Sequence, residues 1–299
     1  MIRSEDFRSE NGVVKRPLAG PIGLVLVSML SVQLGASLAK GLFPAFGPGG
    51  TSLSRLCAAA LVLLPVARPW RHRLARRDML AVAAYGGALG GMNFLFYLAV
   101  ARIPLGVAVA TEFIGPLTLA VLASRRRSDF VWVALAALGI ALILPLTSAT
   151  RAVDLLGLVF ALGAGIFWAL YILAGKKLGE RIPEATATAL GMLFAAVVVL
   201  PFGLAGAGGR LWNPGLWPTT LAVGILSSAL PYTLEMFALK KIPTRTFGIL
   251  MSLEPAIGAL SGLAFLHEIL TPRQWLAIGL VIVASAGASL TTRVTPGAS

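Results

Sequence analysis

Long stretches without a charged side chain are the feature that most constrains how this chain can fold. A bilayer core of about 30 Å needs about 20 helical residues to cross it. Only 12% of the 299 residues are charged, whereas a soluble domain carries roughly a quarter. The sequence therefore predicts an all-α integral membrane protein. Seven uncharged stretches have 19 residues or more: 18–39, 79–101, 130–150, 155–175, 185–209, 211–234 and 274–292.

Three further apolar stretches each contain a single internal charge. Together with the seven uncharged stretches they give ten candidate transmembrane helices. Outer-membrane barrels instead show roughly ten-residue segments of alternating hydrophobicity, so strands are disfavoured. The three stretches are 41–67 with Arg55, 103–124 with Glu112, and 246–266 with Glu254.

Lysine and arginine residues indicate the orientation of these helices. If the N-terminus is cytoplasmic and ten helices follow, 19 of the 25 Lys and Arg residues lie inside. The positive-inside rule then predicts that both termini are cytoplasmic. The net charge of +13 is scattered between apolar runs, which argues against a nucleic-acid partner. Only five basic residues fall outside, namely Lys40, Arg102, Arg151, Arg210 and Arg273, and Arg55 lies within a span.

A weak internal similarity appears when the chain is offset by 139 residues. Ile103-Pro104 then falls on Ile242-Pro243, and Pro116 falls on Pro255. Five helices per half force the second half to enter the membrane from the opposite side, an arrangement typical of secondary transporters. Chance self-similarity is the alternative explanation. The predicted units are a cytoplasmic segment 1–17, a first repeat 18–150, a second repeat 151–292 and a cytoplasmic tail 293–299.

Acidic side chains within the spans are candidates for proton coupling. An ionisable group inside the bilayer costs at least about 2.5–3.5 kcal/mol on insertion scales, so it usually has a function. Glu112 and Glu254 are predicted near the midplane on equivalent helices, and each is followed by a proline. Glu235 lies near the cytoplasmic end of its helix. The alternative is a protonated glutamate bonded across helices or, for Glu235, a salt bridge.

Other polar and aromatic residues in the spans are candidates for binding a substrate. Arg55 and Lys40 could pair with a carboxylate, although either could instead extend to the membrane surface. Four uncharged candidates occur as pairs at helical spacing. Packing is the alternative role for the aromatic ones. The predicted substrate-binding residues are Lys40, Arg55, Asn93, Tyr97, Glu112, Trp168 and Tyr171.

Several catalytic and energy-coupling patterns are missing. Gly175-Lys176-Lys177 lacks the upstream glycine and the Ser/Thr of a phosphate-binding loop. The two histidines, His72 and His267, are predicted in loops on opposite faces, so no histidine-based catalytic or metal site can be assembled. With Cys57 as the single cysteine, no Cys-based metal site forms. We expect a protein that is not an enzyme and needs no metal or cofactor, with a proton gradient as its energy source.

The chain resembles EamA-type members of the drug/metabolite transporter superfamily. The resemblance rests on LGGMNFLFYLAVARIPLGVAVATEFIGPL (89–117) and LPYTLEMFALKKIPTRTFGILMSLEPA (230–256). Further segments are similar to bacterial inner-membrane exporters of threonine and homoserine. These are QLGASLAKGLFP (33–44), RRRSDFVWVALAALG (125–139) and VFALGAGIFWALYILAGKK (159–177). The resemblance implies efflux of small metabolites, energised by protons, through a cavity between two repeats.

The residue chemistry is compatible with this implication. A zwitterionic amino acid needs a cation for its carboxylate, here Arg55 or Lys40, and an anion for its ammonium group, here Glu112. We expect export of small amino acids, threonine and homoserine first, by alternating access and proton antiport in the bacterial inner membrane. Efflux of another metabolite or drug, and a passive channel, are the alternatives. A monomer and a homodimer are both compatible with the sequence.

Overall fold

Helices form all the regular structure in the part of the chain that the computed structural model describes, which is residues 19–72, 74–123, 129–143, 154–239, 247 and 250–291. No strand occurs within these ranges. The helices are α1 (Ala19–Ala67), α2 (Arg76–Val100), α3 (Leu105–Glu112), α4 (Ile114–Ala123), α5 (Asp129–Ile143), α6 (Leu155–Gly179), α7 (Glu184–Ala207), α8 (Trp217–Gly224), α9 (Leu230–Leu239), α11 (Glu254–Leu266) and α12 (Pro272–Thr291), with short turns η1 (Pro69–Arg71), η2 (Gly208–Trp212), η3 (Pro214–Leu216) and η4 (Ile225–Ala229).

The length and hydropathy of these helices confirm an all-helical integral membrane protein. Four helices of the described chain are long and apolar enough to cross a bilayer, at 20–67, 76–100, 155–179 and 184–212. Shorter apolar helices cover 105–119, 130–139 and 254–266. The predicted segments 1–17 and 293–299 lie outside the described residues. So do several of the loop cations used for the orientation, namely Arg125, Arg126, Arg127, Arg151, Lys240, Lys241 and Arg245.

Helix α1 consists of two arms that meet at Gly47. This glycine has φ 65° and ψ 172°, a conformation that side chains with a Cβ rarely adopt, and Pro44 and Pro48 flank it. The Thr51 hydroxyl donates to the Gly47 carbonyl over 2.8 Å, at the start of the second arm. The sequence predicted the boundary between the apolar stretches 18–39 and 41–67 at Lys40. In the structure the boundary lies seven residues later, at Gly47. Lys40 lies inside the first arm.

Prolines also interrupt two helices in the interior of the bundle. A proline has no N–H, so the carbonyl four residues earlier loses its helical partner. Pro116 stands four residues after Glu112, where α3 ends and α4 begins. Pro231 of α9 stands four residues after Ser227. Ser227 lies in η4, a π-helical turn between α8 and α9. Each proline thus frees a main-chain oxygen next to a polar side chain.

Small residues allow the helices to approach closely. A Cβ added at Gly86 or Gly90 of α2 would collide with α7, at Phe194 and at the Ala195 backbone, whereas one at Gly87 would meet nothing within 4 Å. Gly115 of α4 and Gly165 of α6 likewise pack backbone to backbone. Only glycine permits this separation, because any Cβ would occupy the space of the neighbouring main chain.

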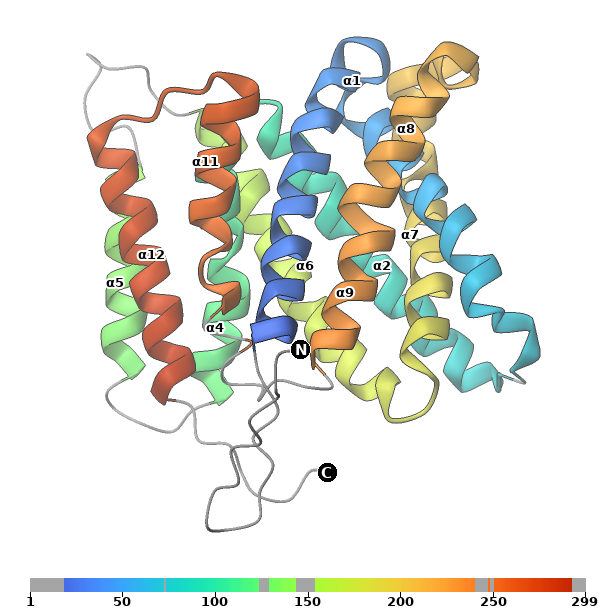
Figure 1. Cartoon of the computed structure of the whole chain (residues 1–299), viewed down its shortest axis with the longest axis horizontal. Helices are drawn as coiled ribbons and strands as arrows, with labels where there is room; N and C mark the ends of the chain where they lie inside the picture. Colours follow the sequence, from blue (N-terminus) through green and yellow to red (C-terminus); the bar gives the residue numbers. More distant parts are fainter. Residues whose placement is uncertain are drawn as a thin grey trace, which may run out of the picture.

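The helices form a single bundle in which sequence-distant segments lie next to one another (Figure 1). Helix α12 runs along α5 at one side of the bundle, α11 packs against α3, and α2 packs against both α6 and α7. The two arms of α1 contact α7, α8, α9 and α11 in the centre. Helix α1 begins and α12 ends at the same end of the bundle (Figure 1); below, this end is called the inner end and the opposite end the outer end.

Candidate functional site

Three charged side chains are buried in the membrane-spanning part of the described chain. They are Arg55 on the second arm of α1, Glu112 at the end of α3 and Glu254 at the start of α11. Each has less than a tenth of its surface exposed. Burying a charge is costly unless it is paired, so these three side chains define the candidate site.

The π-helical turn η4 holds Arg55 in place. Its Nε donates to the Ser228 hydroxyl over 3.1 Å, and its Nη2 donates to the Ser227 carbonyl over 2.6 Å. That carbonyl is available because Pro231 cannot donate to it. The guanidinium carbon lies 5.6 Å from the centre of the Tyr97 ring, within cation–π range. Three of the five guanidinium N–H donors remain for a ligand.

Tyr97 and Asn93 lie one turn apart on α2, as their spacing predicts. Tyr97 is almost fully buried, packs edge to face against Phe43 at 5.8 Å, and has a phenolic oxygen without a hydrogen-bond partner. The Asn93 amide donates to the Leu89 carbonyl over 2.8 Å, within its own helix. The structure therefore brings Tyr97 to Arg55, whereas the Asn93 amide bonds within its own helix.

Glu112 lies where α4 and α6 approach most closely. Gly165 of α6 packs against the main-chain oxygen of Glu112, the oxygen that Pro116 leaves without a helical partner. The charged groups that interact electrostatically with its carboxyl are Glu254 and Arg55. The sequence predicted Glu112 and Glu254 on equivalent helices, and the structure brings both into one electrostatic group with Arg55.

Glu254 is the first residue of α11, and Pro255 follows it. Its Oε2 is buried without a hydrogen-bond partner, and Glu235 is the charged group that acts on it. A carboxylate at a helix N-terminus is favoured by the helix dipole, but this does not replace a hydrogen bond. Glu254 thus presents an unpartnered acceptor inside the bundle.

Three other candidates make their direct contacts with residues other than Arg55. Trp168 packs edge to face on Phe113, with ring centres 5.3 Å apart. The Tyr85 hydroxyl donates to the Tyr171 hydroxyl over 3.1 Å, and Glu235 accepts a 2.6 Å bond from Ser28, both toward the inner end of the bundle. Tyr171 and Glu235, with Tyr85 and Ser28, form a second polar group.

Lys40 lies apart from both groups. Its Nζ pairs with Glu268 Oε1 at 2.5 Å, and Glu268 Oε2 accepts the main-chain N–H of Leu105 over 2.7 Å. This arrangement ties the first arm of α1 to the start of α3 and to the segment after α11. Nearby, Leu42, Phe46 and Tyr97 belong to one buried apolar cluster. The Lys40 pair and this cluster therefore join several segments at the outer end of the bundle.

Sequence reasoning missed Ser227 and Ser228, the direct partners of Arg55. Serines in a span carry no charge and change its mean hydropathy only slightly, so neither charge nor hydropathy distinguishes them. A signal was nevertheless present, because Pro231 stands four residues after Ser227 and marks an unpaired carbonyl. Ser28 and Tyr85 were missed as well, and only the packing of α1 on α9 and of α2 on α6 reveals them.

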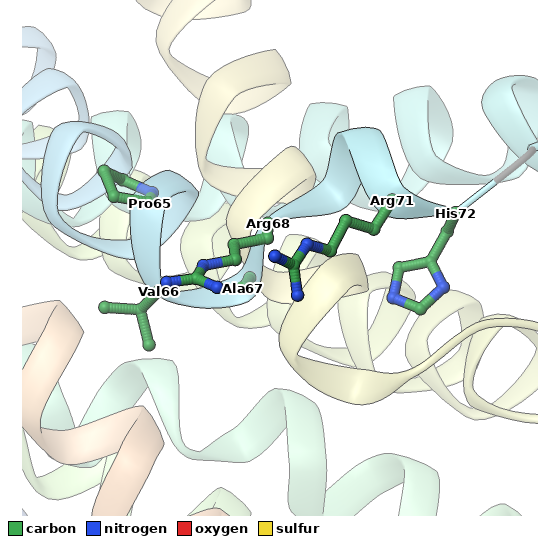
Figure 2. Close-up of a pocket in the computed structure, with 6 residues that line it drawn as sticks. All are labelled: Pro65, Val66, Ala67, Arg68, Arg71 and His72. Atoms are coloured by element: carbon green, nitrogen blue, oxygen red, sulfur yellow. The ribbon is translucent and has the colours of Figure 1, made fainter.

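A surface hollow at the inner end contains a basic group outside the bundle. Figure 2 shows the side chains that line it, on the end of α1 and on η1: Pro65, Val66, Ala67, Arg68, Arg71 and His72. None of these residues contributes to the two polar groups described above. Among the described residues, no group of three His, Cys, Asp or Glu side chains could hold a metal ion.

Comparison with known proteins identifies the family. The model of the EamA-like transporter family matches residues 155–290. The chain is 52% identical over 279 residues to the threonine/homoserine exporter RhtA of Escherichia coli strain K12, covering 93% of this chain and 94% of that protein. It is 50% identical to RhtA of Salmonella typhimurium strain LT2, covering 94% and 95%.

More distant similarities agree with this result. An uncharacterized transporter of Bacillus subtilis, YwfM, is 30% identical and covers 63% of this chain and 66% of that protein. A crystal structure of a protein with 17% identity matches with a TM-score of 0.57 over 90% of this chain and 96% of that one, which supports the fold alone. The chain belongs to the EamA-like transporter family.

Proposed function

We propose that this protein exports threonine and homoserine from the cytoplasm in exchange for protons. The observation that carries the proposal is the buried group of Arg55, Glu112 and Glu254, in which Arg55 and Glu254 both act electrostatically on the Glu112 carboxyl. A small zwitterion has one carboxylate and one ammonium group, and this group of side chains offers a partner for each. The relatives named as threonine/homoserine exporters give the substrate class.

The orientation of the substrate follows from the hydrogen bonds already made. Two donors of Arg55 are fixed on Ser227 and Ser228, so the guanidinium plane is held still while its other N–H groups stay available. Arginine binds a carboxylate through two parallel bonds. We therefore assign the substrate carboxylate to Arg55 and its ammonium group to Glu112.

Competition for the Glu112 carboxyl supports proton antiport. If Glu112 and Glu254 are both ionised next to one guanidinium, a negative charge remains uncompensated in the membrane interior, which is unfavourable. A proton on Glu112 removes this charge in the empty carrier, whereas the substrate's ammonium group needs the same carboxyl in its ionised form, so Glu112 cannot hold both. Substrate binding from one side then requires proton release, and proton binding from the other side returns the empty carrier. Glu235 is the third predicted proton-coupling residue, and a different role for it is argued below.

We propose ten membrane-spanning segments in two inverted repeats, 18–150 and 151–292. The arms of α1 count as two, the pair α3 and α4 as one, and the run from α8 through η4 to α9 as one. The contacts occur in related pairs, which supports a two-fold arrangement. The first arm of α1 packs on the span of α8 and α9 as α6 packs on α2, and the second arm packs on α7 as α3 packs on α11.

Ion pairs near the ends of the spans support the proposed number of spans. Lys40 pairs with Glu268, Arg102 with Asp154, and Arg181 with Asp78. An even number of proposed spans separates the partners in every case, so both partners of each pair lie on the same side of the membrane. The Arg181 pair then lies in the cytoplasm and the other two lie outside.

Counterflow in proteoliposomes tests the proposal. We expect labelled L-threonine and L-homoserine to exchange against internal unlabelled substrate, and an imposed pH gradient to drive their accumulation. A panel of other amino acids and cationic drugs serves as the comparison. Exchange of a drug but of neither amino acid favours the alternative of another efflux substrate, and flux without saturable counterflow favours a channel.

A further inference from the structure

Three tyrosines from three helices gather in the inner half of the bundle. Tyr85 of α2 and Tyr171 of α6 share a hydrogen bond of 3.1 Å between their hydroxyls, and their rings lie 4.8 Å apart. Tyr232 of α9 interacts with Tyr171. Gly191 of α7 and Gly175 of α6 make room for the Tyr85 ring, because a Cβ at either position would contact it. The arrangement is thus built by the packing of four helices.

Glu235 lies beside these tyrosines on α9. It follows Tyr232 by three residues, so both side chains lie on one face of α9. Its Oε1 accepts the 2.6 Å bond from Ser28 of α1, and it interacts electrostatically with Tyr171 and Tyr232. No ion pair to it occurs among the residues that the structure describes. A carboxylate in the membrane interior normally has a compensating positive charge.

These side chains remain accessible although protein surrounds them. Ser28 is fully buried behind Glu235, whereas Glu235, Tyr171 and Tyr232 each keep part of their surface exposed. A carboxylate oxygen, phenolic hydroxyls and aromatic faces are the groups that bind an ammonium ion, through charge-assisted hydrogen bonds and cation–π contacts.

This group adjoins the Arg55 site, since Arg55 acts electrostatically on Tyr232 and Glu235 acts on Glu254, but it lies at another depth in the bundle. Seven residues of the same helical run separate Ser228, which holds Arg55, from Glu235, a rise of about 10 Å along the helix. We therefore place the Glu235 carboxylate about two helical turns inward from the serines that hold Arg55.

We propose that Glu235, Tyr171 and Tyr232 form a second, inner binding site that takes the ammonium group of a small amino acid arriving from the cytoplasm. Tyr85 and Ser28 position the site: Tyr85 fixes the Tyr171 hydroxyl and Ser28 fixes the carboxylate. The substrate occupies this site first and then moves outward to Arg55. The claim that this site receives substrate from the cytoplasm rests on the proposed function, whereas the claim that it binds an ammonium group does not.

Sided transport kinetics test the inner site. In inside-out vesicles, whose cytoplasmic face is outside, Glu235→Gln should raise the half-saturating concentration of labelled L-threonine at least about tenfold, the worth of one charge-assisted hydrogen bond. In right-side-out vesicles the same variant should leave that concentration unchanged. Glu235→Asp keeps the charge and should stay within about threefold of the wild-type value. Glu184→Gln, the same change at an exposed inner position, is the control.

Equal effects on both faces, or an effect on neither, would contradict the inner site.

A second measurement does not depend on transport. In the Glu112→Gln background, calorimetry with L-threoninol, which has the ammonium group but no carboxylate, should detect binding that Glu235→Gln weakens at least about tenfold. Binding that is absent, or indifferent to Glu235, overturns the proposal. If threoninol binds through Glu235 but threonine does not exchange, the inner site stands and the proposed substrate is wrong.

Discussion

At the scale of single residues, Arg55 is the side chain on which substrate recognition depends. Replacing it with alanine removes the partner of the substrate carboxylate, so threonine counterflow should fall to background. Arg55→Lys keeps the charge but not the two-pronged geometry, and should raise the half-saturating concentration by roughly ten- to a hundredfold. Ser228→Ala removes only the 3.1 Å bond that orients the guanidinium and should have a smaller effect. Initial rates of counterflow measure all three.

Glu112 and Glu254 should separate exchange from energy coupling. In Glu254→Gln both Arg55 and Glu112 remain for the substrate, so counterflow without a gradient should persist, while accumulation driven by a pH gradient should be lost. Glu112→Gln should impair both, because Glu112 also takes the ammonium group. The groups that act on the pair are Arg55 and Glu235, and both are unchanged in these variants. Gradient-driven export by both variants would refute the coupling role.

The sequence pointed to some of these residues and not to others for a physical reason. A charge inside a bilayer is rare because it is costly, so Arg55, Glu112 and Glu254 were visible in the sequence as exceptions within apolar runs. Ser227 and Ser228 cost little to bury when they bond to their own helix, so nothing in the composition marked them. The pairing of Lys40 with Glu268 could not be foreseen, since 228 residues separate them.

At the scale of helices, two neighbouring glycines of α2 are needed for its packing against α7, whereas a third is not. The sequence shows four glycines at 86, 87, 90 and 91 as two equivalent patterns, whereas the structure places Gly86 and Gly90 against α7 and leaves Gly87 open. Gly86→Ala and Gly90→Ala should each destabilise the protein by about 1–3 kcal/mol through overpacking. Gly87→Ala should be neutral or slightly stabilising. Thermal unfolding in detergent compares the three, and a loss of stability in Gly87→Ala equal to the others would contradict the packing.

The ion pair between Lys40 and Glu268 should hold the outer end of the bundle closed. Glu268→Gln removes the charge that joins α1 to the start of α3, so the outer end should open more often. In a Cys57→Ser background, a cysteine at the buried position Ala36, one turn below Lys40, should react severalfold faster with an impermeant maleimide added outside.

The exposed pair of Arg102 and Asp154 provides the matched control. The hydrogen bond from Arg102 lowers the pKa of Asp154, so the Asp154 carboxyl is ionised at neutral pH. Asp154→Asn breaks it while keeping a residue that can cap α6, and labelling at position 36 should not change. An equal increase in both variants would show that the Lys40 pair has no special role in closure.

At the scale of the whole molecule, apolar run lengths predicted the class of fold well. They could not locate the break in α1, because hydropathy marks charges such as Lys40, whereas the backbone turns where Gly47 and two prolines allow it. They also could not indicate which helices touch. That information is carried by glycines and small residues whose contacts depend on three-dimensional packing, such as Gly115 against Gly165.

The proposed orientation makes a direct prediction about accessibility. In the Cys57→Ser background, a cysteine at Gly209, in the exposed turn after α7, should react with an impermeant maleimide in intact cells. A cysteine at His72, exposed after η1, should react only after the membrane is opened. The reverse pattern would show that the protein has the opposite orientation in the membrane. Labelling of both positions in intact cells would contradict the proposed number of spans.

Transport against a pH gradient by the purified protein tests the central claim most directly. In proteoliposomes loaded with an acidic buffer and diluted into an alkaline one, the wild-type protein should accumulate labelled L-threonine and L-homoserine above equilibrium as protons leave. Glu254→Gln should exchange these amino acids without accumulating them, and Arg55→Ala should do neither. If the wild-type protein neither exchanges nor accumulates either amino acid, or accumulates them equally without the gradient, this protein is not a proton-coupled exporter of threonine and homoserine.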